Sequence, residues 1–167
     1  LYEYTRSFSE RGTFYWKVVC DGSSLGYPAL EANDTVEVGI AIEAINVTFN
    51  YVSFGNVFPN SFVSAENNNI SYYNITNVGN VNLTIWIKAD NLTNITLGYI
   101  IPANNLYVNS TFNSTLLQLS NNYILLYKNL RPQETITLFF YLNVPPVMAG
   151  KYEGTIYICG NYTSLCF

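Results

Sequence analysis

Residues 81–88 read Val-Asn-Leu-Thr-Ile-Trp-Ile-Lys, and this stretch decides the fold. Its apolar residues alternate with others, which is the period of a β-strand that turns one face to a core. The same period runs through residues 135–144, where every second residue from Ile136 is Ile, Leu, Phe or Val. Pro145 and Pro146 follow, and neither can donate a backbone hydrogen bond to a sheet. The two stretches predict neighbouring strands of a half-buried β-sheet.

The rest of the chain repeats this signal with turn residues about every ten positions and without a helical period. From Thr35 we expect one long strand that changes parity at Ala44-Ile45, through a bulge or a bend, and continues to Phe49. The prediction is an all-β, antiparallel, immunoglobulin-like β-sandwich over residues 13–167, preceded by an arm of residues 1–12. The other β-prone segments are 14–20, 69–76, 95–101, 105–109, 114–119, 122–128 and 151–159.

Asn-X-Ser/Thr triplets, the acceptors of N-linked sugar, are unusually dense in this chain. At Asn82 the triplet agrees with the strand pattern, which places this residue on the outer face. The triplets predict a carbohydrate-coated, exported protein. Their ten asparagines are Asn33, Asn46, Asn69, Asn74, Asn82, Asn91, Asn94, Asn109, Asn113 and Asn161.

Charge is scarce: 11% of the residues are charged, the net charge is −4 and histidine is absent. No basic stripe favours nucleic acid or an anionic membrane surface as a partner, and no apolar run has membrane-spanning length. Because few groups titrate, we expect folding stability to depend weakly on pH.

Catalytic patterns are missing from the sequence. Without histidine, serine and cysteine nucleophiles lack their usual base, and the carboxylates are scattered rather than paired. No spacing indicates a metal site or a cofactor, so we expect no enzymatic activity. The best binding feature is a set of outward aromatic residues that could stack on sugars, contact a neighbouring subunit, or lie under the protein's own glycans or loops: Trp86, Phe139, Tyr141 and Tyr157.

Three cysteines, Cys20, Cys159 and Cys166, are an odd number. In an exported chain we expect one disulfide and one free thiol. Pairing of Cys159 with Cys166 would staple a C-terminal hairpin, whereas pairing of Cys20 with either would join the two ends of the fold. The sequence leaves this choice open.

The arm of residues 1–12 places Tyr2, Tyr4 and Phe8 on one side of an extended segment, and Gly12 separates it from the next strand. Arg6 interrupts the same side. Such an arm can pair within its own sheet or with a neighbouring chain.

Four stretches, 75–84, 130–135, 142–146 and 150–158, resemble immunoglobulin-like domains of archaeal exported proteins. Together with the arm and the sequons, they make the chain similar to the subunits of archaeal threads, surface filaments of thermoacidophilic crenarchaea, and of archaeal bundling pili. The resemblance implies head-to-tail polymerisation by donor-strand complementation, as in bacterial chaperone-usher pili. By position it makes Tyr2, Tyr4 and Phe8 the candidate interface residues, and Arg6 departs from that pattern.

The sequence therefore predicts a glycosylated structural subunit of an extracellular filament that serves adhesion or cell contact. Its expected partners are copies of itself. The alternatives are a monomeric carbohydrate-binding or adhesin module that uses the aromatic residues, and a surface-layer or virion coat component.

Overall fold

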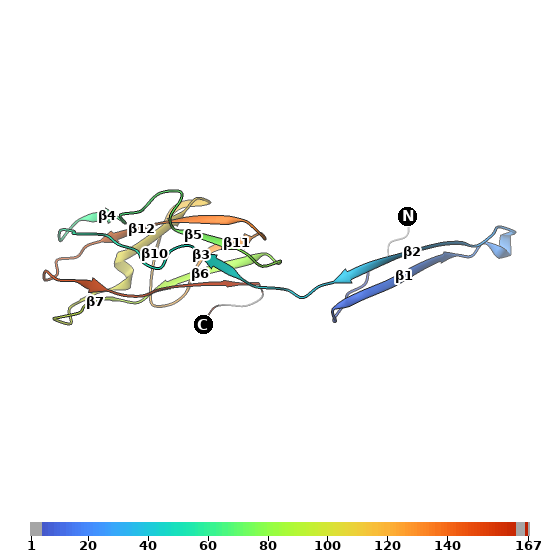
Figure 1. The fold of residues 1–167 in the computed structure, drawn as a ribbon, viewed down its shortest axis with the longest axis horizontal. Coiled ribbons are helices and arrows are strands. Elements are labelled where there is room, and N and C mark those ends of the chain that lie inside the picture. The colour runs from blue at the N-terminus through green and yellow to red at the C-terminus, as the bar shows by residue number, and fades with distance from the viewer. Residues whose placement is uncertain (1–4, 163–165, 167) are drawn as a thin grey trace. The chain divides into compact units, whose positions relative to one another are not determined.

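A computed structural model of the chain describes residues 5–162 and residue 166. The chain forms two compact units, an N-terminal unit of residues 1–41 and a sandwich unit of residues 42–167 (Figure 1). Within the described residues the only helical elements are two 3-10 turns, Ser23–Leu25 and Ala103–Asn105, and all strand pairing is antiparallel. The predicted all-β, antiparallel sandwich is confirmed, and its immunoglobulin-like character stays a prediction. No helix there is both long and apolar enough to cross a membrane.

The N-terminal unit is built on a long hairpin. Strands β1 (Gly12–Cys20) and β2 (Leu30–Val38) pair over nine consecutive positions, from Gly12 opposite Val38 to Cys20 opposite Leu30, without a bulge. The structure thus divides the chain after Ala41, whereas the sequence placed the division after Gly12. The sequence pattern of residues 14–20 is that of a strand in the sandwich. In the structure these residues pair with β2 instead, so they belong to the N-terminal unit.

The predicted continuous strand from Thr35 to Phe49 is wrong. Strand β2 ends at Val38, and the next strand, β3 (Ile45–Val47), belongs to the sandwich unit. Between these strands, the backbone hydrogen-bonds to the turn of residues 78–80 and not to a neighbouring strand. The carbonyl oxygen of Ile42 accepts from Asn80 N at 3.1 Å, and that of Ala44 accepts from Val78 N at 3.0 Å. The apolar alternation through Ile40 and Ile42 therefore does not mark a core face; their side chains are 56% and 54% exposed.

Two main sheets and one small sheet form the sandwich unit. The first sheet has the order β10-β9-β12-β5-β3, and β4 also pairs with β12; the second has the order β11-β6-β14; the small one has the order β13-β7-β8. Their bounds are β4 Phe62–Ser64, β5 Asn74–Asn77, β6 Leu83–Ala89, β7 Leu92–Asn94, β8 Ile100–Ile101, β9 Leu106–Ser110, β10 Asn113–Gln118, β11 Ile124–Leu130, β12 Thr135–Asn143, β13 Tyr152–Glu153 and β14 Ile156–Asn161.

The core lies between the sheets of β6 and β12, as the alternation predicts. Leu83, Ile85 and Ile87 of β6 are fully buried, and Ile136, Leu138 and Phe140 of β12 face them in the same hydrophobic cluster. Thr137, expected to face outward, is also buried, and its hydroxyl is satisfied by donating to Asn74 Oδ1 at 2.7 Å.

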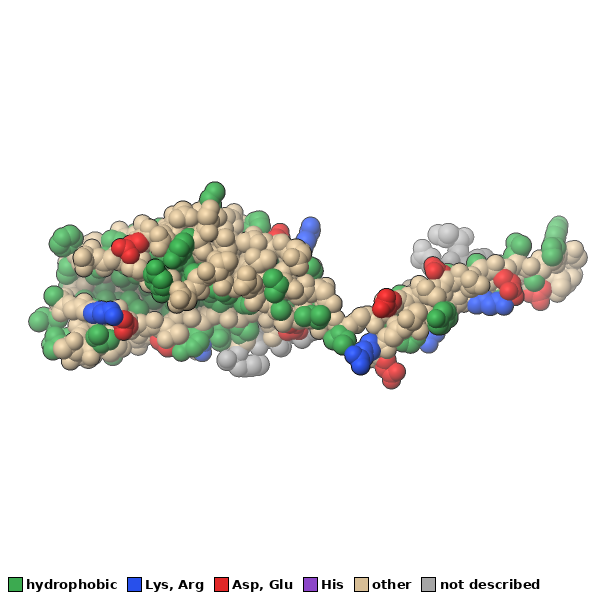
Figure 2. Space-filling model, viewed as in Figure 1, with side chains coloured by type: hydrophobic (Ala, Val, Ile, Leu, Met, Phe, Trp, Pro, Cys, Tyr) green, Lys and Arg blue, Asp and Glu red, His purple; other side chains and the backbone are tan. Residues whose placement is uncertain are grey.

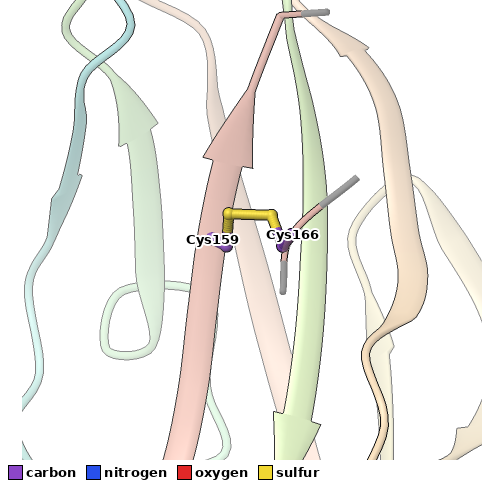
Figure 3. The surroundings of a disulfide bond; sticks show 2 residues. All are labelled: Cys159 and Cys166. Atoms are coloured by element: carbon purple, nitrogen blue, oxygen red, sulfur yellow. A yellow bond between two sulfur atoms is a disulfide. The ribbon is translucent and has the colours of Figure 1, made fainter. Parts of the chain in front are cut away.

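The structure resolves the open choice among the cysteines. Cys159 of β14 is bonded to Cys166, with the two Cα atoms 6.2 Å apart (Figure 3). Cys20 is an exposed free thiol. Cys159 lies directly opposite Trp86 of β6. The disulfide thus ties residue 166 to the outer face of the second sheet.

Candidate functional site

The sandwich unit contains an open groove of about 1540 Å³. This volume exceeds the roughly 300–1000 Å³ of a usual small-molecule site. Two stretches far apart in sequence line it, residues 47–57 and residues 147–158, and buried core residues such as Leu106 and Leu142 form part of its lining. On the face drawn in Figure 2, hydrophobic side chains gather in a hollow of this unit.

The groove runs beside the edges of both main sheets. Strand β3 ends the first sheet and strand β14 ends the second, so among the described strands each pairs on one side only. The two edges approach each other closely at Gly160, where an added Cβ atom would lie 2.6 Å from Ile45 Cγ2. Since half of the backbone N–H and C=O groups of an edge strand point away from its partner, β14 can accept a further strand.

The groove lining is apolar. Phe49, Val57, Val147, Ile156 and Ile158 line it, and each is only half-buried. Among the described lining residues the charged side chains are Lys151 and Glu153, which are exposed and form an ion pair with each other. Such a lining suits an apolar extended peptide rather than an ion or a polar small molecule. No cluster of potential metal ligands occurs anywhere in the described part of the chain.

The hairpin of the N-terminal unit has two chemically different faces, since directly opposite residues share a face. Its apolar face is uncovered over most of its length: Trp16 is 46% exposed, Val18 50% and Leu30 71%. Asp34 is the one charged residue on this face. The cross-strand pairs of the apolar face are Gly12 with Val38, Phe14 with Val36, Trp16 with Asp34, Val18 with Ala32, and Cys20 with Leu30.

The opposite face of the hairpin is polar. Lys17 Nζ lies 2.7 Å from Glu31 Oε1, and the sequon residue Asn33 stands directly opposite Lys17. A glycan on Asn33 would extend from this polar face and leave the apolar face free. The remaining cross-strand pairs are Thr13 with Glu37, Tyr15 with Thr35, and Val19 with Glu31.

Of the predicted interface residues, Tyr2 and Tyr4 lie outside the described residues. Phe8 packs on Phe14 of its own unit, with the ring centroids 4.5 Å apart, and Arg6 lies over the Phe8 ring at 5.7 Å. Residues 5–11 form no strand. The described part of the predicted arm therefore covers one end of the apolar face, and the larger apolar surface belongs to β1 and β2.

Nine of the ten sequon asparagines have at least partly exposed side chains. Exposed are Asn33, Asn46, Asn69, Asn82 and Asn113; half-buried are Asn74, Asn91, Asn109 and Asn161. Asn82 lies on the outside of the sandwich, as the alternation predicted.

Asn94 is the exception, at 1% exposure. Its Oδ1 accepts hydrogen bonds from Thr96 N at 3.0 Å and Leu97 N at 2.9 Å, and its Nδ2, the atom that would carry a sugar, is buried. A Cβ atom on Gly150 would lie 2.1 Å from this Nδ2, so no space remains for a sugar. The folded structure thus excludes Asn94 as a glycan acceptor. Its side chain caps the turn after β7.

The four outward aromatic residues do not form one surface. Trp86 and Tyr157 lie on the second sheet, whereas Phe139 and Tyr141 lie on β12 of the first sheet, across the core. Trp86 Nε1 is buried, and Tyr157 donates its hydroxyl to Asp90 Oδ2 at 2.9 Å. That hydrogen bond raises the pKa of Tyr157. A sugar-binding platform made of all four residues is therefore excluded.

Comparison of the chain with protein-family models, curated proteins and solved structures found no match.

Sequence reasoning missed the groove because residues 50–65 read as an apolar crossover. One feature of the sequence could have indicated the groove. This segment is more apolar than an exposed loop usually is, with four large apolar residues within seven positions: Val52, Phe54, Val57 and Phe58. An apolar segment without strand periodicity can line a site that is completed by another chain.

Proposed function

We propose that this protein is a structural subunit of an extracellular filament, in which the apolar face of the β1–β2 hairpin of one copy enters the groove of the next. The observation that carries the proposal is that one chain holds both an uncovered apolar ribbon and an uncovered apolar groove beside an edge strand. The proposal moves the donor role from residues 1–12 to the hairpin.

Energetics favour this contact. An isolated two-stranded hairpin is marginally stable in water, so the N-terminal unit gains from any surface that covers it. Full burial of a Val or Leu side chain contributes about 1.5–3 kcal/mol, and Val18 and Leu30 now expose half or more of their area. Pairing with β14 would also give this edge strand a ladder on its second side.

Geometry makes the product a fibre. The hairpin and the groove are different surfaces, so a contact between two copies leaves one hairpin and one groove free, and addition continues without closure. The exposed sequons and the scarcity of charge, visible as the mostly uncharged surface of the sandwich unit in Figure 2, support a glycan-coated filament outside the cell. Adhesion or cell contact is the role we assign to it.

Two neighbouring valines test the proposal. Val18 and Val19 are both 50% exposed but lie on the apolar and the polar face respectively. Burying an unpaired ammonium costs about 3–5 kcal/mol, so Val18→Lys should weaken polymerisation by about 100-fold or more. Val19→Lys, which places its charge beside Glu31, should polymerise like the unchanged chain. Sedimentation velocity and electron microscopy of the fibres measure both.

Mixing variants tests the direction of assembly. Ile158→Lys charges the groove and keeps the hairpin, whereas Val18→Lys keeps the groove; each alone should be monomeric, and their mixture should stop at dimers. Met148→Lys, at a groove residue that is 56% exposed, replaces Ile158→Lys if that variant does not fold.

Polymerisation of Val18→Lys as readily as Val19→Lys would contradict the proposal. A chain that stays monomeric at every concentration would contradict it too. Sugar binding by that monomer would then favour a carbohydrate-binding module.

A further inference from the structure

The outer face of the first sheet carries an aromatic strip that the polymer contact leaves unused. Phe62 of β4 stacks on Tyr141 of β12 with the ring centroids 5.8 Å apart and the planes 9° from parallel. Tyr107 of β9 meets the same Phe62 ring edge-to-face, with the ring centroids 5.8 Å apart. We call Tyr107, Phe62 and Tyr141 the aromatic strip. Phe62 at its centre is 54% exposed, which is costly for a phenyl ring unless something covers it.

A sequon adjoins this strip. Asn109, of the triplet Asn109-Ser110-Thr111, lies two residues after Tyr107 on β9 and therefore on the same face. In the ladder with β12, Asn109 stands directly opposite Phe139, and Tyr107 stands directly opposite Tyr141. Opposite residues have Cβ atoms about 4.5–5.5 Å apart, and a glycan on Asn109 would therefore start beside Phe139, two residues along the ladder from Tyr107 and Tyr141.

The Asn109 side chain is held in place for such an attachment. Its Nδ2 donates to Ser114 O at 3.2 Å in an exposed setting, while its Oδ1 is buried without a partner. Nδ2 keeps one hydrogen after it is glycosylated, so a donor for the bond to Ser114 remains. Tyr107 is also oriented, because Gln118 Nε2 donates to its hydroxyl at 3.2 Å.

We propose that the aromatic strip is the surface on which the protein's own glycan packs, with the first sugars linked to Asn109 lying across Tyr107, Tyr141 and Phe62. The C–H groups on one face of a pyranose ring are apolar and pack on aromatic rings. The attached sugar would cover Phe62 and gain contact without the entropic cost of a second molecule. This inference rests on the glycosylation in the proposed function, but not on polymerisation.

The test is a thermodynamic cycle on protein made in a host that glycosylates Asn-X-Ser/Thr. Loss of the glycan by Asn109→Gln should lower Tm by about 2–4 °C, the shift that corresponds to roughly 1 kcal/mol in a domain of this size. In the background Phe62→Ser with Tyr141→Ser the same change should lower Tm by clearly less, because the rings that the sugar covers are gone and only the bond from Asn109 to Ser114 is lost. Asn82→Gln, which removes a sequon on the second sheet, should not depend on these rings.

Nuclear Overhauser contacts between sugar protons and the Phe62 and Tyr141 rings give a direct readout in the unchanged protein. The proposal is overturned if Asn109 carries no glycan by glycopeptide mass spectrometry, if Tm falls equally in both backgrounds, or if these contacts are absent. Binding of a free oligosaccharide to the strip, with the attached sugar making no contact, would assign it to an external carbohydrate and also overturn the proposal. The Val18→Lys experiment is independent of all these outcomes.

Discussion

Gly79 shows how closely single residues are constrained in the sandwich unit. It is buried in the 78–80 turn, and a Cβ atom there would lie 2.0 Å from Ile42 O, a backbone atom that cannot move aside. Gly79→Ala should therefore lower the free energy of unfolding by about 2–4 kcal/mol. Gly98→Ala, where φ is +72° but no atom lies within 4 Å, should cost only about 1 kcal/mol. Denaturant unfolding compares the two, and equal losses would contradict the steric argument.

Asn94 gives a second prediction at this scale. Glycopeptide mass spectrometry should find Asn94 unmodified and the exposed Asn46 and Asn82 occupied. Asn94→Gln should destabilise the fold by about 1–3 kcal/mol, because the longer side chain loses its bonds to Thr96 and Leu97; Asn82→Gln should change stability by less than about 0.5 kcal/mol. A glycan on Asn94 in folded protein would contradict the structure.

The sequons also mark how far sequence reasoning reaches for single residues. A triplet specifies the chemistry that an enzyme can recognise, and the strand period placed Asn82 outside correctly. Neither the triplet nor the strand period could predict that Asn94 is buried, because Gly150, the residue that packs against its side chain, is more than fifty positions away in the sequence. Burial at a turn depends on such distant contacts rather than on the local pattern.

At the scale of strands, alternation predicted β6 and β12 well, since both have long apolar faces and partners on two sides. It failed at residues 35–49. An alternating segment indicates that one face of the strand is apolar, but it does not identify the element that covers this face. Strand β2 pairs with β1, and the apolar face of the resulting hairpin stays largely exposed. The pairing of Cys159 with Cys166 was likewise left open, because spacing alone does not determine which thiols meet.

Cys20 provides a test of the hairpin as a whole element. Its exposed thiol lies on the apolar face, opposite Leu30. We expect an alkylating reagent to modify Cys20 quickly in monomers and at least 10-fold more slowly in fibres, because the docked face excludes water. A Val19→Cys thiol in a Cys20→Ala background, on the polar face, should react at similar rates in both states. Equal labelling of Cys20 before and after assembly would show that this face stays open.

At the scale of the whole molecule, we expect folding stability to depend weakly on pH between mild acid and mild base. It contains no histidine. The amide and hydroxyl of Ser23 bond to Asp21 and lower the pKa of its carboxyl from the ordinary value of 3.8. The hydrogen bond to Asp90 raises the pKa of Tyr157 above 10.0, and burial does the same for Tyr73.

The direction of the pH dependence follows from these shifts. The Asp21 contribution is present above pH 3.8 and lost as pH falls through its lowered pKa, while the tyrosine contributions are present below pH 10.0 and lost as pH rises through theirs. Tm should therefore be nearly constant from about pH 5 to about pH 9 and fall on both sides. A steep change in Tm near pH 6.5, measured by calorimetry, would contradict this.

The position of β14 has a mechanical consequence. Antiparallel hydrogen bonds lie perpendicular to the strand, so a ribbon seated along β14 and pulled along its length would load all those bonds at once instead of peeling them one by one. A pulling force between two cells would then be shared by all backbone hydrogen bonds of the subunit contact. The Cys159–Cys166 bond ties that same strand to residue 166.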